Sequence, residues 1–415
     1  MLNRVLKHPS FSRYASGMMW SYLGQIVAGI SSFCLSIFVA HYIDKNTYGS
    51  YRYVLSVIGI VSVFGLTGLR VAVARSAATG YQYALRSAAE LYTKYSLGTL
   101  TLTVALGCYY LYKENFIFGL TFVICGIVSV FAGRIQYYTI FLTSIQSYRQ
   151  SALYAMYTDL IMSSMMVLVI LIHPHVLTLT LTFFFSNYVT NAYFNWLTQK
   201  NLTTAKPDSD KSQEMESQAK HQSLANFFSL IVTYIDKLIV FQFVGAVELA
   251  IYSFSLAMPE FLKTFVKLIS TLFFPALSNA RNVQRVKKVL TVTIASSICV
   301  SVAAVVFYLF TARFWYETFF SNYQASIYPS MVYSLVILIA SVQTPINNFF
   351  AARINNNLLH HATIASAIIQ IIVLVIGVLI SPSVLGVITA KLIGQVLGLF
   401  YVSTVLALRY RGAIL

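Results

Sequence analysis

Charged residues are scarce in this 415-residue chain, making up 10% of the sequence, and only 12 of them are Asp or Glu. A soluble protein of this length needs much more charge to cover the surfaces of its domains. Hydrophobic residues reach 58%, the mean hydropathy is +0.72, and apolar runs of about 20 residues recur along nearly the whole chain. The composition therefore excludes an ordinary soluble protein and predicts an all-α polytopic membrane protein.

Cysteine is also rare, and the 4 cysteines show neither zinc-ligand spacing nor a disulfide framework. All lie inside apolar runs, where cysteine behaves as a small hydrophobic residue, so we expect no disulfide and no metal site. The sequence contains no nucleophile elbow, phosphate-binding loop, zinc-protease motif or paired-carboxylate arrangement. It also has no soluble domain large enough to bind a nucleotide sugar, so we predict that the protein is not an enzyme. The cysteines are Cys34, Cys108, Cys125 and Cys299.

The apolar runs and the breakers between them predict about twelve membrane-spanning helices. Short links marked by charge or proline, such as 113–115 and 381–383, require consecutive helices to turn back as hairpins. The polar segment 199–222 is rich in Ser, Gln, Lys and Glu, lacks aromatic residues and has the composition of a flexible linker. It would separate an N-terminal six-helix bundle, 1–198, from a C-terminal six-helix bundle, 223–415. The expected spans are 15–40, 49–69, 95–112, 116–145, 153–172, 177–198, 224–244, 249–274, 289–311, 328–350, 362–380 and 384–407.

Lysine and arginine are distributed unevenly between the two sets of loops. One set holds most of them, whereas the other holds only Lys45, Arg52, Lys113 and Arg313. By the positive-inside rule the basic set faces the cytoplasm, which places both termini and the linker there. The formal net charge of +16 therefore reflects membrane topology, and we expect no nucleic-acid partner.

Asp236 and Lys237 lie side by side inside a predicted span, although a charge near the bilayer centre costs roughly 2.5 to 3.5 kcal/mol. Asp236 is about 18 Å from the cytoplasmic end of its span at 1.5 Å per residue, which is near the middle of the membrane. Because adjacent helix positions point about 100° apart, we predict that the two residues do not pair with each other. At least one of them should then find a partner on another helix or in a wet cavity.

The next span offers candidate partners on one helix face. Glu260, Lys263 and Lys267 are spaced at i, i+3 and i+7, and Pro259 just before them is expected to kink the helix. Structural pairing alone would need about as many acids as bases, yet the buried charges are mostly basic. A cavity with surplus Lys and Arg suits a phosphate-bearing substrate. The other cations within the spans are Arg70, Arg134 and Lys391.

These charges predict a central cavity between the two bundles, which is a transporter plan. Asp236 and Glu260 would orient the cations or carry coupled protons. The alternative is structural: Asp236 and Lys237 would brace helices through an interhelical salt bridge, while Arg70 and Lys267 would snorkel to the interface. The predicted anion-binding residues are Arg70, Arg134, Lys237, Lys263, Lys267 and Lys391.

Several short stretches resemble one family of transporters. The segment 229–278 contains the run Asp236-Lys237-Leu238, then Gly245 before Ile251-Tyr252-Ser253, then Pro259 and a closing Phe274-Pro275-Ala276-Leu277. It is similar to the seventh and eighth helices of bacterial polysaccharide flippases of the Wzx type, in the multidrug/oligosaccharidyl-lipid/polysaccharide exporter superfamily. The first hairpin, 38–57, resembles the same family at Tyr48, Gly49 and Tyr51 but departs from it at His41, Ile43 and Asp44. The segment 65–78, with Arg70, resembles the end of its second helix.

The resemblance implies two six-helix bundles with alternating access. It implies a substrate, an undecaprenyl-pyrophosphate-linked oligosaccharide such as an O-antigen or capsule repeat unit, moved from the cytoplasmic to the periplasmic leaflet of the bacterial inner membrane. In that family a cationic cavity is thought to hold the pyrophosphate and sugars. No cofactor is implied beyond coupling to H⁺ or Na⁺, and the expected partners are membrane lipids, a polysaccharide polymerase and the chain-length machinery of lipopolysaccharide biosynthesis.

Other classes make different demands on the sequence. A membrane-embedded polysaccharide polymerase or glycosyltransferase should have a large external loop, whereas the longest candidate outer loop here is 312–327. A cation-coupled drug exporter shares the two-bundle plan but should have an acid-rich cavity. A structural scaffold would not need so many charges in the middle of the bilayer.

Overall fold

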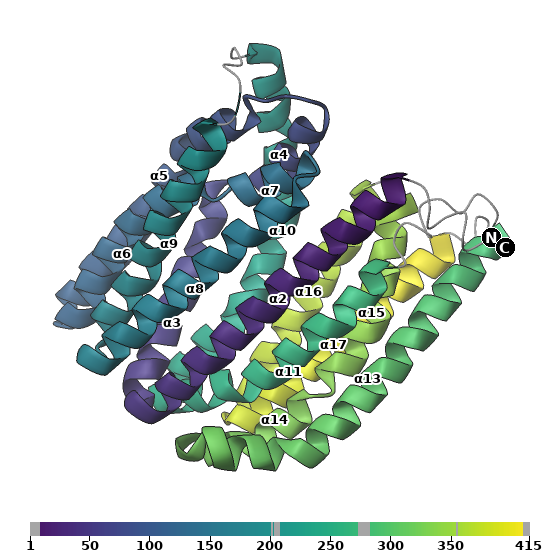
Figure 1. Cartoon of the computed structure of the whole chain (residues 1–415). Coiled ribbons are helices and arrows are strands. Elements are labelled where there is room, and N and C mark those ends of the chain that lie inside the picture. Colours follow the sequence, from purple (N-terminus) through teal and green to yellow (C-terminus); the bar gives the residue numbers. More distant parts are fainter. Residues whose placement is uncertain (1–8, 201, 203–207, 273–282, 354–355, 410–415) are drawn as a thin grey trace. The chain divides into compact units, whose positions relative to one another are not determined.

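The computed structural model describes residues 9–200, 202, 208–272, 283–353 and 356–409, and every regular element within these ranges is helical (Figure 1). The all-α prediction is confirmed. In chain order the first elements are α2 (Pro9–Tyr42), α3 (Lys45–Val61), η1 (Ser62–Gly65), α4 (Leu69–Ala78), α5 (Ala84–Tyr112), α6 (Phe116–Ile135), α7 (Tyr138–Ser144), α8 (Tyr148–Ile172), α9 (Val176–Lys200) and α10 (Ser209–Phe243). They are followed by α11 (Ala246–Leu272), α13 (Val283–Phe319), η2 (Ser321–Ser326), α14 (Ile327–Tyr333), α15 (Val336–Arg353), α16 (Asn356–Ile380) and α17 (Val384–Arg409).

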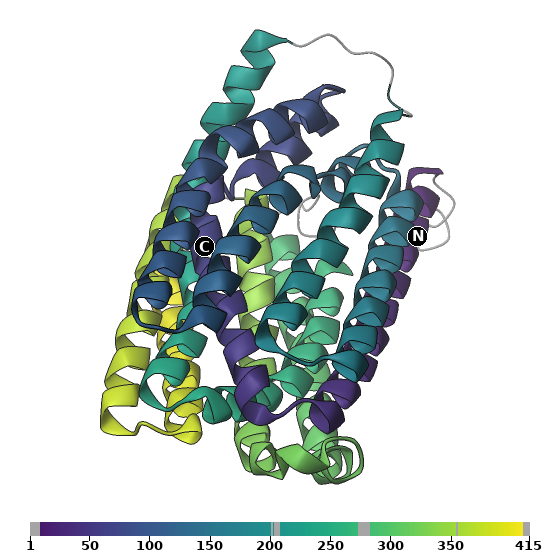
Figure 2. The same cartoon turned by 90° about the vertical axis from the view of Figure 1, so that its left-hand side faces the viewer.

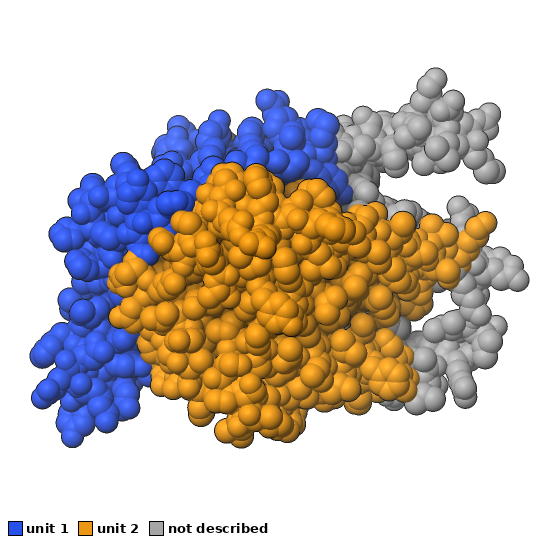
Figure 3. Space-filling view, turned by 90° about the horizontal axis from the view of Figure 1, so that it is seen from below, with its two compact units in different colours: residues 1–43, 57–227 blue, residues 44–56, 228–415 orange. Residues whose placement is uncertain are grey.

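The chain forms two compact units, coloured separately in Figure 3. Unit 1 contains residues 1–43 and 57–227, and unit 2 contains residues 44–56 and 228–415. The helices α3 and α10 each contribute residues to both units. The first part of α3 belongs to unit 2 because Gly49 lies directly against the backbone of Ala246, where a Cβ atom would come within 1.8 Å of the carbonyl oxygen.

Unit 1 contains a hairpin of α5 and α6, which are joined by a short link, and two parallel pairs, α6 with α9 and α2 with α8. Helix α5 packs along α6, α6 along α9, and α2 along α8 (Figure 2). Its apolar core joins α4, α5 and α7 to the beginning of α10, and Leu69, Ala88, Tyr138 and Met215 are almost fully buried there. In unit 2, α11 packs against α13, α14 and α15, and α16 forms a hairpin with α17.

The prediction of a flexible linker is wrong for residues 209–222, which form the first turns of α10. Lys, Glu, Gln and Ala favour helix, and Met215 and Ala219 give this segment an apolar side that is fully buried in unit 1. Asp208 caps the helix by accepting hydrogen bonds from the backbone N–H groups of Asp210 and Lys211. The same composition that suggests disorder can therefore form an amphipathic helix once a surface is available to cover its apolar side.

Glu216 fastens this segment to α5. Its carboxylate accepts hydrogen bonds from the Tyr95 hydroxyl, from Lys220 at 3.0 Å and from Lys94 at 3.1 Å. These donors, the Tyr95 hydroxyl first, hold the pKa of Glu216 at about 2. Gly68 at the start of α4 completes the docking, because its N–H donates to Ser223 Oγ at 2.8 Å.

All twelve predicted spans coincide with helices or bent helix pairs, but not all are equally apolar. Within the described residues, seven helices are long and apolar enough to cross a membrane, and two bent pairs raise the number to nine. Helices α5, α9 and α11 are equally long but more polar: α5 and α9 bury several threonines, such as Thr103 and Thr190, inside unit 1, and α11 carries Glu260, Lys263 and Lys267. Pro259 lies inside α11, and the family-like motif at 274–277 lies outside the described residues.

Candidate functional site

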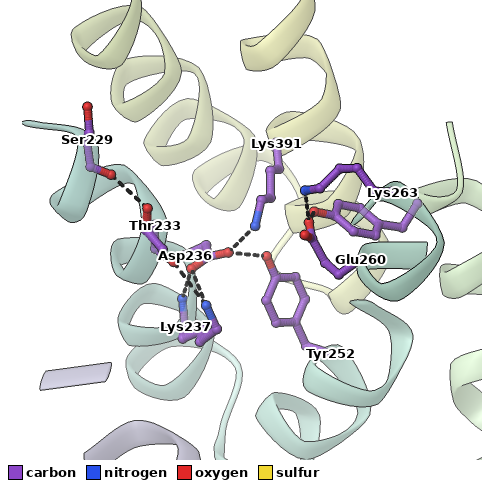
Figure 4. A network of polar contacts seen from close by, with 9 residues as sticks. Ser229, Thr233, Asp236, Lys237, Tyr252, Glu260, Lys263 and Lys391 are labelled. Atoms are coloured by element: carbon purple, nitrogen blue, oxygen red, sulfur yellow. Dashed lines mark hydrogen bonds and ion pairs between the residues drawn. The ribbon is translucent and has the colours of Figure 1, made fainter. Parts of the chain in front are cut away.

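A fully buried carboxylate, that of Asp236 on α10, is the centre of the polar network in unit 2 (Figure 4). Its Oδ2 atom accepts a hydrogen bond from the Tyr252 hydroxyl of α11 at 2.6 Å and lies 2.5 Å from the Lys391 ammonium of α17. Three helices therefore meet at one charged group. The prediction that Asp236 or Lys237 finds a partner on another helix is confirmed, and the partner is Lys391 rather than a residue of the Glu260 stripe.

Lys237 corrects the prediction that adjacent residues would not pair. Its ammonium lies 3.5 Å from Asp236 Oδ1 and donates to the carbonyl oxygen of Thr233 at 3.0 Å. The lysine stem is long enough to fold back along the helix, so the angle between the two Cα–Cβ bonds does not decide where the charge lies. The contact to Asp236 is much longer than that of Lys391, and Lys391 is the principal counter-ion.

A second acid–base pair lies on α11 and begins directly after Pro259. Glu260 Oε1 accepts hydrogen bonds from Lys263 and from the Tyr333 hydroxyl of α14, the latter at 2.6 Å. Lys391 connects the two pairs, because its ammonium lies 5.9 Å from the ring centroid of Tyr252 and 5.5 Å from that of Tyr333. We call the seven residues of this network the polar centre: Asp236, Lys237, Tyr252, Glu260, Lys263, Tyr333 and Lys391.

The polar centre has more positive than negative groups, with three lysines and two carboxylates. The lysine side chains are largely shielded from solvent: Lys237 and Lys263 are each 13% exposed, and Lys391 is 16% exposed. The carboxylates already engage these lysines, so an incoming anion would compete with Asp236 and Glu260 for them. Beside Asp236 and Lys391 lies a cavity of about 20 Å³, bordered also by Gln370, which is room for about one water molecule.

Arg52 on α3 is a further cation near the polar centre, and the sequence reasoning placed it in an outer loop. It lies close enough to Lys237 to repel it electrostatically. Its Nε atom is buried and has no hydrogen-bond partner among the described residues. No sequence signal separated Arg52 from other loop cations. Tyr252 was noted only as part of a family-like run, and nothing distinguished Tyr333 from the other tyrosines among the 29 of the chain.

The remaining predicted site residues lie elsewhere. Lys267 is exposed on α11, one turn beyond Lys263. Arg70 is exposed on α4, and Arg134 is exposed at the end of α6, so both belong to unit 1. The structure brings together five of the predicted site residues: Asp236, Lys237, Glu260, Lys263 and Lys391. A single cavity that also includes Arg70 and Arg134 stays a prediction. Within the described ranges no group of three or more His, Cys, Asp or Glu residues could hold a metal ion.

Comparison with known proteins gives one family and one fold. A family model described as "Polysaccharide biosynthesis protein" matches residues 38–329, and no curated protein sequence matches the chain significantly. The fold is similar to that of the lipid II flippase MurJ in an inward closed conformation, with a TM-score of 0.72 and 13% identity over 94% of this chain and 86% of that chain.

Two structures of a multidrug resistance MATE family transporter of the MOP superfamily are also similar. The inward-facing one has a TM-score of 0.62 and 13% identity, over 92% of this chain and 95% of that chain. The outward-facing one has a TM-score of 0.59 and 13% identity, over 95% of this chain and 96% of that chain. The chain therefore has the fold of these polytopic membrane transporters.

Proposed function

Because the chain belongs to the polysaccharide biosynthesis protein family, we propose that it is a flippase for lipid-linked oligosaccharides. Its substrate would be an undecaprenyl-pyrophosphate-linked repeat unit of an O-antigen or capsule, moved from the cytoplasmic to the periplasmic leaflet of the bacterial inner membrane. The observation that carries the proposal is the polar centre, where three largely buried lysines outnumber two carboxylates within a bundle of apolar helices. Both termini would face the cytoplasm, as the lysine and arginine distribution indicates.

The polar centre supports an exchange of partners as the transport step. Without substrate, Asp236 and Glu260 offset part of the charge of the three lysines, which would otherwise carry a larger desolvation penalty. A pyrophosphate offers more charge than a carboxylate and can displace it from Lys391 or Lys263. The released carboxylate would then need a proton or a monovalent cation, so coupling to H⁺ or Na⁺ through Asp236 or Glu260 belongs to the same proposal.

A transporter of cationic drugs is the second candidate, because MATE transporters share the fold. The charge balance of the polar centre favours an anion instead, since a site for a cation should hold surplus carboxylates. We also propose that the protein is a transporter and not a polysaccharide polymerase or glycosyltransferase. A polymerase and the chain-length machinery would then be its partners in the membrane.

Complementation of a strain that lacks its own flippase tests this proposal. Lys263→Gln and Lys391→Gln should each abolish surface polysaccharide, whereas Lys113→Gln, which removes an exposed lysine at the end of α5, should restore it fully. Immunoblotting of membranes must show that all variants are inserted in equal amounts. Normal surface polysaccharide from both polar-centre variants would rule out a role for these lysines in substrate binding.

A further inference from the structure

Unit 1 contains a polar cavity of about 400 Å³ between α5, α6 and α9. Its lining comes from the first turns of α5, the end of α6 and the C-terminal half of α9, from Tyr188 onwards. The lysine and arginine distribution assigns this end of the three helices to the cytoplasm. Its polar lining residues are Arg86, Glu90, Arg134, Tyr188, Asn195 and Gln199.

The cavity carries a net positive charge, from two arginines and one glutamate. Glu90 accepts a hydrogen bond from the Tyr83 hydroxyl at 3.1 Å, and the Arg86 guanidinium lies 5.9 Å from the centroid of the same ring. Arg134 has no hydrogen bond or ion pair with any other residue that the structure describes. A guanidinium whose donors are free matches the two oxygens of a phosphate in its fork-like geometry.

An apolar stripe leads away from the cavity along α6. Phe131, Ile127 and Leu120 precede Arg134 by 3, 7 and 14 positions, so all four lie on one face of the helix. The three apolar side chains are 53%, 41% and 47% exposed, and Leu97 on the neighbouring α5 is 60% exposed. A polar cavity that continues into an exposed apolar stripe has the pattern of an amphiphile, with an anionic group at one end and a hydrocarbon chain at the other.

We propose that this cavity binds the phosphate group of a lipid in the cytoplasmic leaflet, with the hydrocarbon chain of the lipid along the α6 stripe. Arg134 and Arg86 hold the phosphate oxygens, and Asn195, Gln199 and Glu90 bind hydroxyl groups of the head. The phosphate comes either from a membrane phospholipid or from a polyprenyl pyrophosphate. Binding at this site does not depend on the flippase proposal, because the cavity lies entirely within unit 1.

Lipid binding to the delipidated full chain in detergent, followed by native mass spectrometry, tests the site. The variant is Arg86→Gln/Arg134→Gln. Its matched control is Arg75→Gln/Lys113→Gln, which removes the same charge from exposed positions of unit 1 outside the cavity. The probes are phosphatidylglycerol, undecaprenyl pyrophosphate and diacylglycerol, which has no phosphate.

We expect wild type and control to bind a phosphate-bearing lipid at least about tenfold more tightly than the double glutamine variant does, since charge-assisted hydrogen bonds are lost. Arg86→Lys/Arg134→Lys keeps the positive charges but loses the two-pronged guanidinium donors, and it should recover part of the affinity. Such recovery shows that the loss in the glutamine variant is not caused by misfolding. Tighter binding of undecaprenyl pyrophosphate identifies the polyprenyl lipid as the ligand, and equal or tighter binding of phosphatidylglycerol identifies a membrane phospholipid. Equal affinity in variant and wild type, or equal binding of diacylglycerol, overturns the inference.

Discussion

Replacing Lys391 by methionine removes the ammonium group 2.5 Å from Asp236 Oδ2 and keeps most of the side-chain volume. Asp236 is fully buried, and the donors that remain from other side chains are the Tyr252 hydroxyl at 2.6 Å and the Lys237 ammonium at 3.5 Å. Breaking a buried ion pair by removing one partner costs about 3 to 5 kcal/mol. Because two donors remain, we expect the free energy of unfolding to fall by about 3 kcal/mol, at the lower end of that range.

The assay is denaturant unfolding of the full chain in detergent, with Lys113→Met as the matched control. Lys113 is exposed beyond the end of α5, so the control should change stability by less than about 0.5 kcal/mol. The double variant Asp236→Asn/Lys391→Met removes both charges of this contact, although Lys237 then loses its longer contact to Asp236, and it should recover at least half of the loss. If Lys391→Met were as stable as Lys113→Met, the ion pair could not be what joins α10 to α17.

Two further predictions concern packing and the start of α10. Gly49→Ala should destabilise the protein by about 1 to 3 kcal/mol or prevent folding, because the new Cβ would lie 1.8 Å from the Ala246 carbonyl oxygen. Gly24→Ala, whose nearest neighbour would be 3.8 Å away, should be neutral or stabilising in the same denaturant unfolding assay. Equal effects of the two substitutions would refute the close contact. Glu216 has a pKa of about 2 instead of 4.5, so the stability that it contributes is present above about pH 4.5 and is lost as the pH falls towards 2. Hydrogen exchange of residues 209–222, corrected for the intrinsic exchange rate, should therefore accelerate between pH 5 and pH 2 in wild type. In Glu216→Gln it should hardly change. The same pH dependence in both proteins would contradict this prediction.

Hydropathy was enough to place the helices, because an apolar run in lipid must become a helix to satisfy its backbone hydrogen bonds. The depth of Asp236 was likewise enough to require a partner from another helix. The identity of that partner was not predictable, since Lys391 and Asp236 are brought together only by the packing of α17 against its neighbours. Periodicity within one segment contains no information on such a contact.

The two wrong predictions, on the Asp236–Lys237 contact and on residues 209–222, both depended on local sequence pattern alone. The Asp236–Lys237 contact depends on a flexible lysine stem, whereas the angle of about 100° between successive helix positions describes only where the side chains start. The polar composition of residues 209–222 indicates disorder, yet Met215 and Ala219 at i and i+4 supply an apolar side. A helical-periodicity test of that segment would have revealed it.

Transport by the purified protein is the most direct measurement of the proposed function. The full chain is reconstituted into proteoliposomes with a fluorescent undecaprenyl-pyrophosphate-linked oligosaccharide, and the fraction of label in each leaflet is followed with a membrane-impermeant quencher. We expect wild type and Lys113→Gln to equilibrate the labelled lipid between leaflets, and Lys391→Gln to be slowed to the rate of empty liposomes. Equilibration at the wild-type rate by Lys391→Gln would contradict the role of the polar centre, and no equilibration by the wild-type protein would contradict the flippase assignment itself.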